Sequence, residues 1–282
     1  LFDKISGTMI VGGENGVFYV ADLNTEFDYL GDTLSINPKY YRYTWNASKQ
    51  DDKMTQIDAS IAMYGPYAYF GDKEGVLQCV DVNTLETVWA VRTGDQIEST
   101  AALEMSEDGD GVALYVGNTI ENEGKNGVAS IFRFDALSGR KIWQFDVPDL
   151  AYDSNDPVGI YASPVVGQES VKELVFFTAT DGDNDSTLYA LNKDDGSIAW
   201  SYTFTSPTES SPVAVYNAAG DAWIVQGTSD GQLYLLEADT GKVLDTLQLE
   251  GSLRASPAVY RDVLIISTTG VNPSYIYAIA LE

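Results

Sequence analysis

Hydrophobic and polar residues alternate with a period of two along most of this chain, and no stretch of ten residues has helical periodicity. Segments such as IFRFDA, LYALNK and LYLLEA would place alternate side chains on opposite faces of a strand. Gly, Asn and Asp interrupt the alternation roughly every eight to twelve residues, as hairpin turns do. The pattern therefore predicts an all-β protein of short antiparallel strands, without a helix.

One phrase recurs along the chain. The segment GQLYLLEADTGKVLD at 231–245 returns as STLYALNKDDGSIAW at 186–200, as ASIFRFDALSGRKIW at 129–143, and more faintly as GVLQCVDVNTLETVW at 75–89. Six copies align on one position that is aromatic in all but the second: Tyr19, Gln78, Phe132, Tyr189, Tyr234 and Tyr277. A repeat near 43 residues, as in the last two intervals, indicates one supersecondary unit stacked many times.

A second phrase precedes the repeat: ASPVV at 162–166, SSPVA at 210–214 and ASPAV at 255–259. Proline cannot donate to a ladder hydrogen bond, so it belongs at the first residue of a strand or on an edge. We interpret these segments as the innermost strand of each sheet. Each unit then has four antiparallel strands, which predicts a β-propeller with about six visible blades in a single domain over residues 1–282.

The two end blades differ from the rest in this interpretation. No Ser-Pro segment precedes the first blade, and the last copy stops at Glu282 before its closing strand. The chain also begins with Leu rather than Met. We therefore expect a segment of a longer protein, in which upstream residues could complete a ring of seven or eight blades.

The phrase LYALxxxxGxxxW with its upstream Ser-Pro strand resembles the pyrroloquinoline-quinone-type propeller repeat. That family includes quinone-dependent alcohol dehydrogenases and a non-enzymatic outer-membrane assembly lipoprotein. For the dehydrogenases, the resemblance implies an adjacent Cys pair, a catalytic Asp, and Glu, Asn and Asp ligands to calcium. This chain has a single cysteine, Cys79, and none of the other positions can be assigned by motif. The assembly-protein type is therefore favoured, without pyrroloquinoline quinone.

Composition excludes several functions. The chain has 42 acidic and 16 basic residues, a formal net charge of −26, and no histidine. A nucleic-acid interface needs Lys and Arg, so DNA or RNA binding is not expected. Without histidine there is no Ser-His-Asp triad and no imidazole base. No run of 18 apolar residues predicts a transmembrane segment, and Cys79 is expected to be a buried apolar residue.

One acidic loop is a candidate calcium site. Asp181, Asp183 and Asp185 stand at alternate positions, as in the first half of a calcium-binding loop. The pattern then departs from the EF-hand, because Ser186 replaces the turn glycine and Asn192 replaces the closing glutamate. A polar hairpin loop without metal is the alternative.

Departures from the repeat point to a binding face. The insertions at 118–127, 147–160 and 181–186 fall at one end of the predicted blades, whereas 26–39 falls at the opposite end. Insertions that gather on one face of a repeat array often mark its binding surface. We expect packing roles for the tryptophans at one repeat position, Trp89, Trp143 and Trp200.

These observations favour a non-catalytic scaffold that is extracellular, on the cell surface or periplasmic, and that presents a loop-rich acidic face to a protein or glycan partner. No cofactor is expected apart from the calcium candidate. The alternative is an enzyme, either a quinone-dependent dehydrogenase or a carbohydrate-active one, with its active site in the central channel.

Overall fold

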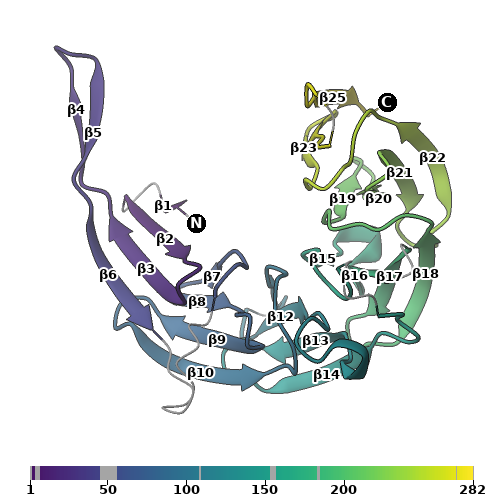
Figure 1. Ribbon diagram of the computed structural model, residues 1–282, viewed down its shortest axis with the longest axis horizontal. Helices are drawn as coiled ribbons and strands as arrows, with labels where there is room; N and C mark the ends of the chain where they lie inside the picture. Colours follow the sequence, from purple (N-terminus) through teal and green to yellow (C-terminus); the bar gives the residue numbers. More distant parts are fainter. Residues whose placement is uncertain are drawn as a thin grey trace.

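The described residues form β-sheets arranged side by side around an open arc (Figure 1). The structure is a computed structural model, and it describes residues 2–3, 7–44, 56–107, 109–152, 157–182, 185–270 and 272–281. Five sheets have four strands, one has three, and a two-stranded hairpin projects from the first sheet. The predicted all-β propeller of four-stranded antiparallel blades is confirmed.

Sheets are numbered in chain order, and their strands are given from the innermost outward. Sheet 1 contains β1 (Phe2–Asp3), β2 (Thr8–Gly12), β3 (Val17–Asp22) and β6 (Lys39–Thr44). Sheet 2 contains β7 (Ala62–Tyr64), β8 (Tyr67–Phe70), β9 (Val76–Asp81) and β10 (Glu86–Arg92). Sheet 3 contains β11 (Ala102–Met105), β12 (Val112–Gly117), β13 (Ser130–Asp135) and β14 (Lys141–Asp146).

The second half of the arc repeats this order. Sheet 4 contains β15 (Val165–Val166), β16 (Leu174–Thr180), β17 (Ser186–Asn192) and β18 (Ile198–Phe204). Sheet 5 contains β19 (Val213–Tyr216), β20 (Ala222–Gly227), β21 (Gln232–Glu237) and β22 (Val243–Gln248). Sheet 6 contains β23 (Ala258–Tyr260), β24 (Val263–Ser267) and β25 (Ile276–Ala280). The projecting hairpin is β4 (Thr25–Asp28) with β5 (Thr33–Ile36), and two short 3₁₀ turns are η1 (Gly124–Asn126) and η2 (Glu169–Val171).

Two details of the first sheet differ from the sequence prediction. The innermost strand that appeared to be missing is present, because Phe2 and Asp3 pair antiparallel with Met9 and Thr8. It carries no Ser-Pro phrase, so the repeat did not reveal it. The predicted insertion at 26–39 is a regular hairpin that extends the ribbon of β3 and β6 away from the arc (Figure 1).

The core is divided between the sheets rather than centred in the molecule. Five clusters of buried apolar residues each join two neighbouring sheets. Ile10 and Phe18 of sheet 1, for example, pack with Phe70 of sheet 2, and the two phenylalanine rings stack 5.1 Å apart. A sheet therefore buries both of its faces only if another sheet packs on each side of it.

The predicted packing role of the repeated tryptophans is confirmed. The indole N–H of Trp143 donates to the carbonyl of Lys193 in the next sheet at 2.6 Å, and the ring covers the turn at Gly196. A Cβ on Gly196 would lie 2.8 Å from that ring, and its φ of +74° also favours glycine. Trp89 and Trp200 make the same contact with the following sheets, and a β-bulge precedes each tryptophan.

The serines of the Ser-Pro phrase link neighbouring sheets on the inner side of the arc. The backbone N–H of Thr100 donates to the Ser163 hydroxyl at 3.2 Å, and the N–H of Ser163 donates to the Ser211 hydroxyl at 2.9 Å. The N–H of Ser211 continues the series to Ser256 at 3.0 Å. One chain of hydroxyl contacts thus links sheets 3 to 6 at their innermost strands.

Candidate binding site

The three predicted insertions interlock at one end of sheets 3 and 4. Gly159 bridges Thr119 on one side and Thr180 on the other, each in antiparallel fashion. Its N–H donates to the Thr180 carbonyl at 2.9 Å, and the N–H of Ile160 donates to the Asn118 carbonyl at 3.1 Å. The expectation that these loops share one face is therefore confirmed, and they form a hydrogen-bonded platform.

A buried carboxylate anchors the 118–127 loop to this platform. Asp95, which is 2% exposed, accepts hydrogen bonds from the backbone N–H groups of Gln96, Asn122 and Glu123 at 2.7 to 3.2 Å. The Asn122 side chain donates in turn to the carbonyl of Lys73 in sheet 2 at 2.7 Å. The insertion is thus fixed to two sheets by polar contacts, and its Ile120 is also buried in the apolar cluster between sheets 3 and 4.

A row of repeat-equivalent side chains borders the platform on the inner side of the arc. We call it the inner rim; each member directly precedes the Ser or Thr phrase of an innermost strand. Its members are Asp58, Glu98, Tyr161, Glu209 and Arg254. The residue before each one is buried against the preceding sheet, as Ile97 and Ile160 show. That burial fixes where the next side chain emerges.

Charges on the inner rim are paired across sheets. Lys73 lies 2.8 Å from the Asp58 carboxylate and 3.6 Å from that of Glu98. Burial raises the pKa of Glu98, and the Lys73 ammonium partly opposes this shift. Tyr161 donates its hydroxyl hydrogen to the Glu121 carboxylate. Burial is the main cause that raises the pKa of Tyr161, and this hydrogen bond raises it further.

The second half of the rim has a further ion pair, in which the Arg254 guanidinium lies 3.5 Å from Glu209. The three acids of the rim, Asp58, Glu98 and Glu209, therefore all have cationic partners. In the part of the chain that the structure describes, no group of three acidic, Cys or His residues could hold a metal ion.

The proposed calcium residues are only partly placed. The Asp181 carboxylate accepts from the backbone N–H of Ala151 at 3.1 Å, and its own N–H donates to the Asp185 carbonyl at 2.9 Å. Asp181 thus ties the 147–160 insertion to the acidic loop. Asp183 lies outside the described residues, so calcium binding stays a prediction.

The residues do not fit the quinone site that the dehydrogenase resemblance implies. Cys79 is the chain's single cysteine, and it is buried in β9 between sheets 2 and 3 rather than on the inner rim. Burial raises the pKa of its thiol to about 12, so it carries no thiolate near neutral pH. The predicted role of Cys79 as a buried apolar residue is confirmed.

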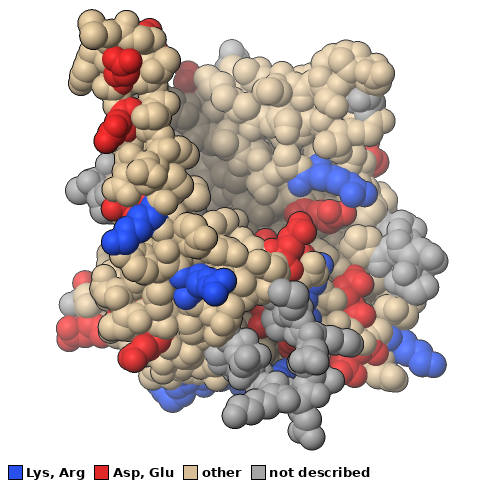
Figure 2. Space-filling model, turned by 60° about the vertical axis from the view of Figure 1, so that its left-hand side comes forward, with Lys and Arg blue, Asp and Glu red and all other residues tan. Residues whose placement is uncertain are grey.

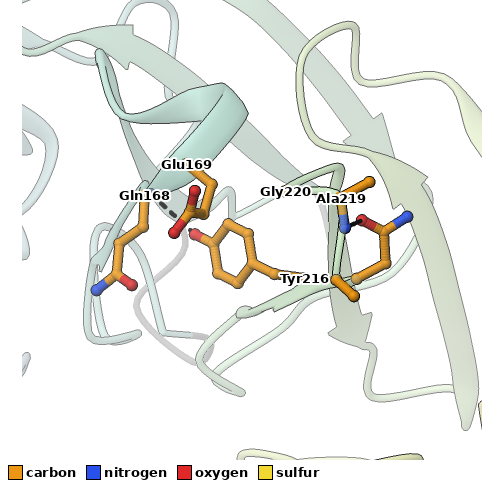
Figure 3. A pocket seen from close by; sticks show the side chains of 7 residues that line it. Gln168, Glu169, Tyr216, Ala219 and Gly220 are labelled. Atoms are coloured by element: carbon orange, nitrogen blue, oxygen red, sulfur yellow. Dashed lines mark hydrogen bonds between the residues drawn. The ribbon is translucent and has the colours of Figure 1, made fainter.

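A small cavity of about 290 Å³ lies at the opposite end of sheets 4 and 5 (Figure 3). Tyr216 points into it, and its hydroxyl accepts from the backbone N–H of Gln168 at 2.9 Å. Glu169 lies beside that ring, at the start of η2, with a φ of +47°. Sequence analysis missed this cavity, because its remaining wall is the ordinary turn at 217–220.

The inner rim was also missed, although a signal was available. The aligned phrases IDAS, IEST, IYAS, TESS and LRAS show one variable position inside an otherwise regular frame. A position that varies in charge while its neighbours stay fixed is typical of a surface that serves binding. The alignment could have singled it out before the structure was known.

A family model described as "Outer membrane protein assembly factor BamB" matches residues 42–217 and 184–279. The matched regions begin within β6 and end within β25, so they span sheets 2 to 5 and nearly all of sheet 6. The chain belongs to this family. The BamB-type repeat thus accounts for the recurring tryptophan phrase and for the Ser-Pro strands.

Other similar proteins share only part of their length with this BamB-type chain. The beta-alanine-activating enzyme of Mus musculus is 28% identical over 114 residues, covering 40% of this chain and 10% of the enzyme. The quinoprotein alcohol dehydrogenase PedH of Pseudomonas putida is 26% identical over 168 residues, covering 57% of this chain and 25% of PedH.

Solved structures support the propeller fold. Sqt1 of Saccharomyces cerevisiae superposes with a TM-score of 0.65 at 12% identity, covering 100% of this chain and 69% of Sqt1. A europium-containing methanol dehydrogenase gives a TM-score of 0.61 at 14% identity, covering 86% of this chain and 49% of the dehydrogenase. No helix among the described residues is long and apolar enough to cross a membrane.

Proposed function

We propose that this chain is a non-catalytic propeller scaffold that binds a protein partner through the platform of interlocked insertions and the adjacent inner rim. The observation that carries the proposal is the bridge of Gly159 to Thr119 and Thr180, which fixes three insertions as one surface. Preorganised loops lose little conformational entropy on binding, which favours stable recognition. Membership in a family described as an assembly factor supports the same role.

A protein partner fits the surface better than a glycan. The platform presents paired charges and backbone groups over two sheets, and its exposed aromatic side chain, Tyr152, packs beside Gly124 rather than standing free as a stacking platform. We place the protein outside the cytoplasm, on the cell surface or in the periplasm, in keeping with the family's description.

Site-specific photo-crosslinking tests the binding surface. A photoreactive amino acid at Tyr152 on the platform should give one discrete protein adduct in the native cells. The same amino acid at Leu244, which is similarly exposed on the outermost strand β22, should give none. Equal adducts at both positions would contradict a specific surface at the platform.

The runner-up is a quinone-dependent enzyme, favoured by the similarity to PedH and by the fold shared with a methanol dehydrogenase. Purified protein incubated with pyrroloquinoline quinone and calcium should show no dye-linked alcohol oxidation above a heat-denatured control. Clear turnover would replace the scaffold proposal by the enzymatic one.

A further inference from the structure

The cavity of sheets 4 and 5 lies where sheet 4 departs from the repeat (Figure 3). The first two strands of this sheet are joined by residues 167–173, which include η2, whereas two residues make the same connection in sheets 2 and 6. Val171 is 2% exposed and packs in the apolar cluster between sheets 4 and 5. The N–H of Ser170 donates to the Gly220 carbonyl at 3.2 Å. The wall that carries Glu169 is therefore held in place before any ligand binds.

A carboxylate and an aromatic ring meet in this cavity. A Cβ on Gly220 would lie 3.4 Å from Oε2 of Glu169, and Figure 3 shows this carboxylate beside the hydroxyl end of the Tyr216 ring. Burial is the main cause that raises the pKa of Tyr216; the bond from Gln168 opposes it, and the Glu169 charge raises it further. Among the described residues, no Lys or Arg forms an ion pair with Glu169.

The two lysines that neighbour this wall bind other partners. The Lys172 ammonium lies 3.2 Å from the Glu107 carboxylate. Lys193 pairs with Glu104 and donates to the Gly167 carbonyl at 2.9 Å. Neither of them neutralises the carboxylate in the cavity, so its charge is available to a ligand.

The lining of the cavity selects an organic cation. Calcium needs six to eight oxygen ligands, which a single carboxylate does not supply. An anion would meet the charge of Glu169, and no cationic side chain lines the cavity. The volume of about 290 Å³ lies at the lower limit of small-molecule sites, so it suits one group of side-chain size. A guanidinium matches best, because its planar fork binds a carboxylate through two parallel hydrogen bonds and stacks on an aromatic ring.

The neighbouring seam of the same molecule shows the complete arrangement. The Arg133 guanidinium lies 5.8 Å from the centroid of the Tyr115 ring, and the Tyr115 hydroxyl donates to the Glu104 carboxylate at 3.1 Å. Tyrosine, glutamate and arginine thus form one cluster between sheets 3 and 4. The cavity between sheets 4 and 5 presents a tyrosine and a glutamate without the arginine.

We propose that this cavity binds a guanidinium group, presented as the arginine side chain of a peptide or as free arginine. The Glu169 carboxylate accepts hydrogen bonds from two N–H groups of the guanidinium, and the Tyr216 ring packs against the guanidinium plane. This site lies at the opposite end of the sheets from the platform. It goes beyond the proposed scaffold function and does not depend on it.

NMR titration of the purified protein tests the site. The probes are the tripeptide acetyl-Gly-Arg-Gly-amide, free L-arginine, and acetyl-Gly-citrulline-Gly-amide, whose neutral urea group has nearly the shape of a guanidinium. The net charge of −26 attracts any cationic peptide, and acidic side chains occur at many separate places on the face shown in Figure 2. The backbone amides of Gln168 and Gly220 therefore serve as a local readout.

We expect the arginine tripeptide to shift these two amides and to bind at least about 10-fold more tightly than the citrulline tripeptide. Glu169→Gln should weaken that binding about 5-fold or more. Glu173→Gln, which removes the same charge outside the cavity, should leave the binding within about 2-fold of wild type. Tyr216→Phe should retain binding, whereas Tyr216→Leu should weaken it about 3-fold, because only the aromatic ring attracts the cation.

Equal binding of the arginine and citrulline tripeptides would overturn the proposal, because the cavity would then not distinguish a cation. Equal losses in Glu169→Gln and Glu173→Gln would also overturn it and would identify general attraction to an acidic surface. Tighter binding of the tripeptide than of free arginine would support the site and identify a peptide as its ligand, and the reverse would support the site and identify the free amino acid. Unchanged thermal melting confirms that each variant folds, and crosslinking at the platform is unaffected by any of these outcomes.

Discussion

Some buried side chains in this protein differ from their equivalents in the other repeats because they are ionisable. Asp72 is one of them; its carboxylate is enclosed and accepts from the backbone N–H groups of Val76 and Glu74 at 2.9 and 3.0 Å. Burial raises the pKa of Asp72 to about 6, and those two bonds only partly oppose the shift. The folded protein therefore binds this proton more tightly than the unfolded chain, whose aspartate has a pKa of about 3.9.

Asp72→Asn should reveal how the stability of the folded protein depends on the protonation of Asp72. The stability from the tightly bound proton is fully present below about pH 4 and is lost as the pH rises through about 6. The free energy of unfolding of Asp72→Asn, relative to wild type, should therefore increase by on the order of 2 kcal/mol between those limits. Urea unfolding at several pH values measures it. Hydrogen bonds from Ser197 lower the pKa of Asp195, so Asp195→Asn should show the opposite trend; a constant difference for Asp72→Asn would contradict the argument.

Lys193 is a second departure. Its ammonium lies 2.5 Å from the Glu104 carboxylate and donates to the Gly167 carbonyl at 2.9 Å. Trp143 and Arg133 both donate to the backbone carbonyl of this same residue. In the third and fifth sheets the equivalent residue is the alanine that receives the tryptophan bond. A buried ion pair has thus replaced an apolar position at the seam of sheets 3 and 4.

Lys193→Ala should destabilise the protein by about 2 kcal/mol, because it leaves the partly buried Glu104 without its cation. Replacing both residues, as Lys193→Met with Glu104→Leu, should restore most of that loss. The exposed pair of Lys172 and Glu107 provides the matched control, since solvent screens this pair and Lys172→Ala should have little effect on stability. Equal losses at the two lysines would argue against a special role for the buried pair.

At the scale of strands, neighbouring sheets fit together through one close approach. A Cβ on Gly117, at the end of β12, would lie 2.4 Å from Ile160, and Gly12, Gly71 and Gly227 make the same approach to a buried aliphatic residue. Sheet 4 solves the contact differently. Thr178 takes the glycine position, and the repeat equivalent of Ile160 is Thr208, whose side chain has one heavy atom fewer than that of isoleucine.

Gly117→Ala should therefore destabilise the protein by about 1 to 3 kcal/mol through overpacking against Ile160. Adding Ile160→Thr, which imitates the pair in sheet 4, should recover part of this loss. Gly111→Ala is the control, because its Cβ would meet nothing closer than 3.5 Å. Chemical denaturation of the three variants checks the order; additive losses in the double variant would count against steric coupling.

Most elements of the fold follow from the repeat, because alternation and turn residues are local signals. The anchor strands, the tryptophans and the insertion face are all predictable from the sequence. β1 is not predictable in this way, since two residues carry no pattern, and the hairpin of β4 and β5 was expected to be a loop. The inner-rim pairs, such as Lys73 with Glu98, are not predictable either, because they join different repeats across space.

At the scale of the whole molecule, charge and architecture act together. The net charge of −26 repels itself in the compact state, and salt screens this repulsion over a Debye length of about 8 Å at 0.15 M. Raising sodium chloride from low concentration should increase the thermal midpoint by on the order of 2 to 4 °C. Calorimetry measures it, and a midpoint that falls with salt would contradict dominant self-repulsion.

If the Asp181 loop binds calcium, calcium should stabilise the protein by more than the screening of its charge repulsion. At matched ionic strength, calcium chloride should raise the midpoint of the wild type further than sodium chloride, because a ligand that binds the folded state stabilises it. Asp183→Asn should abolish the excess and retain the common screening effect. Identical midpoints in the two salts would remove Asp181, Asp183 and Asp185 from consideration as a metal site.

The glycine contact at the end of the second strand also has an evolutionary consequence. Each such glycine meets a side chain from the next repeat, as Gly71 meets Ile97. Tandem duplication of a repeat that carries both the glycine and a buried aliphatic residue at these positions, such as Gly117 and Ile97 of sheet 3, keeps each contact of this kind intact. Exchange of one sheet with that of a distant relative breaks two contacts at once. Growth and shrinkage by whole repeats is therefore the easy route for this architecture, and recombination of single blades is the hard one.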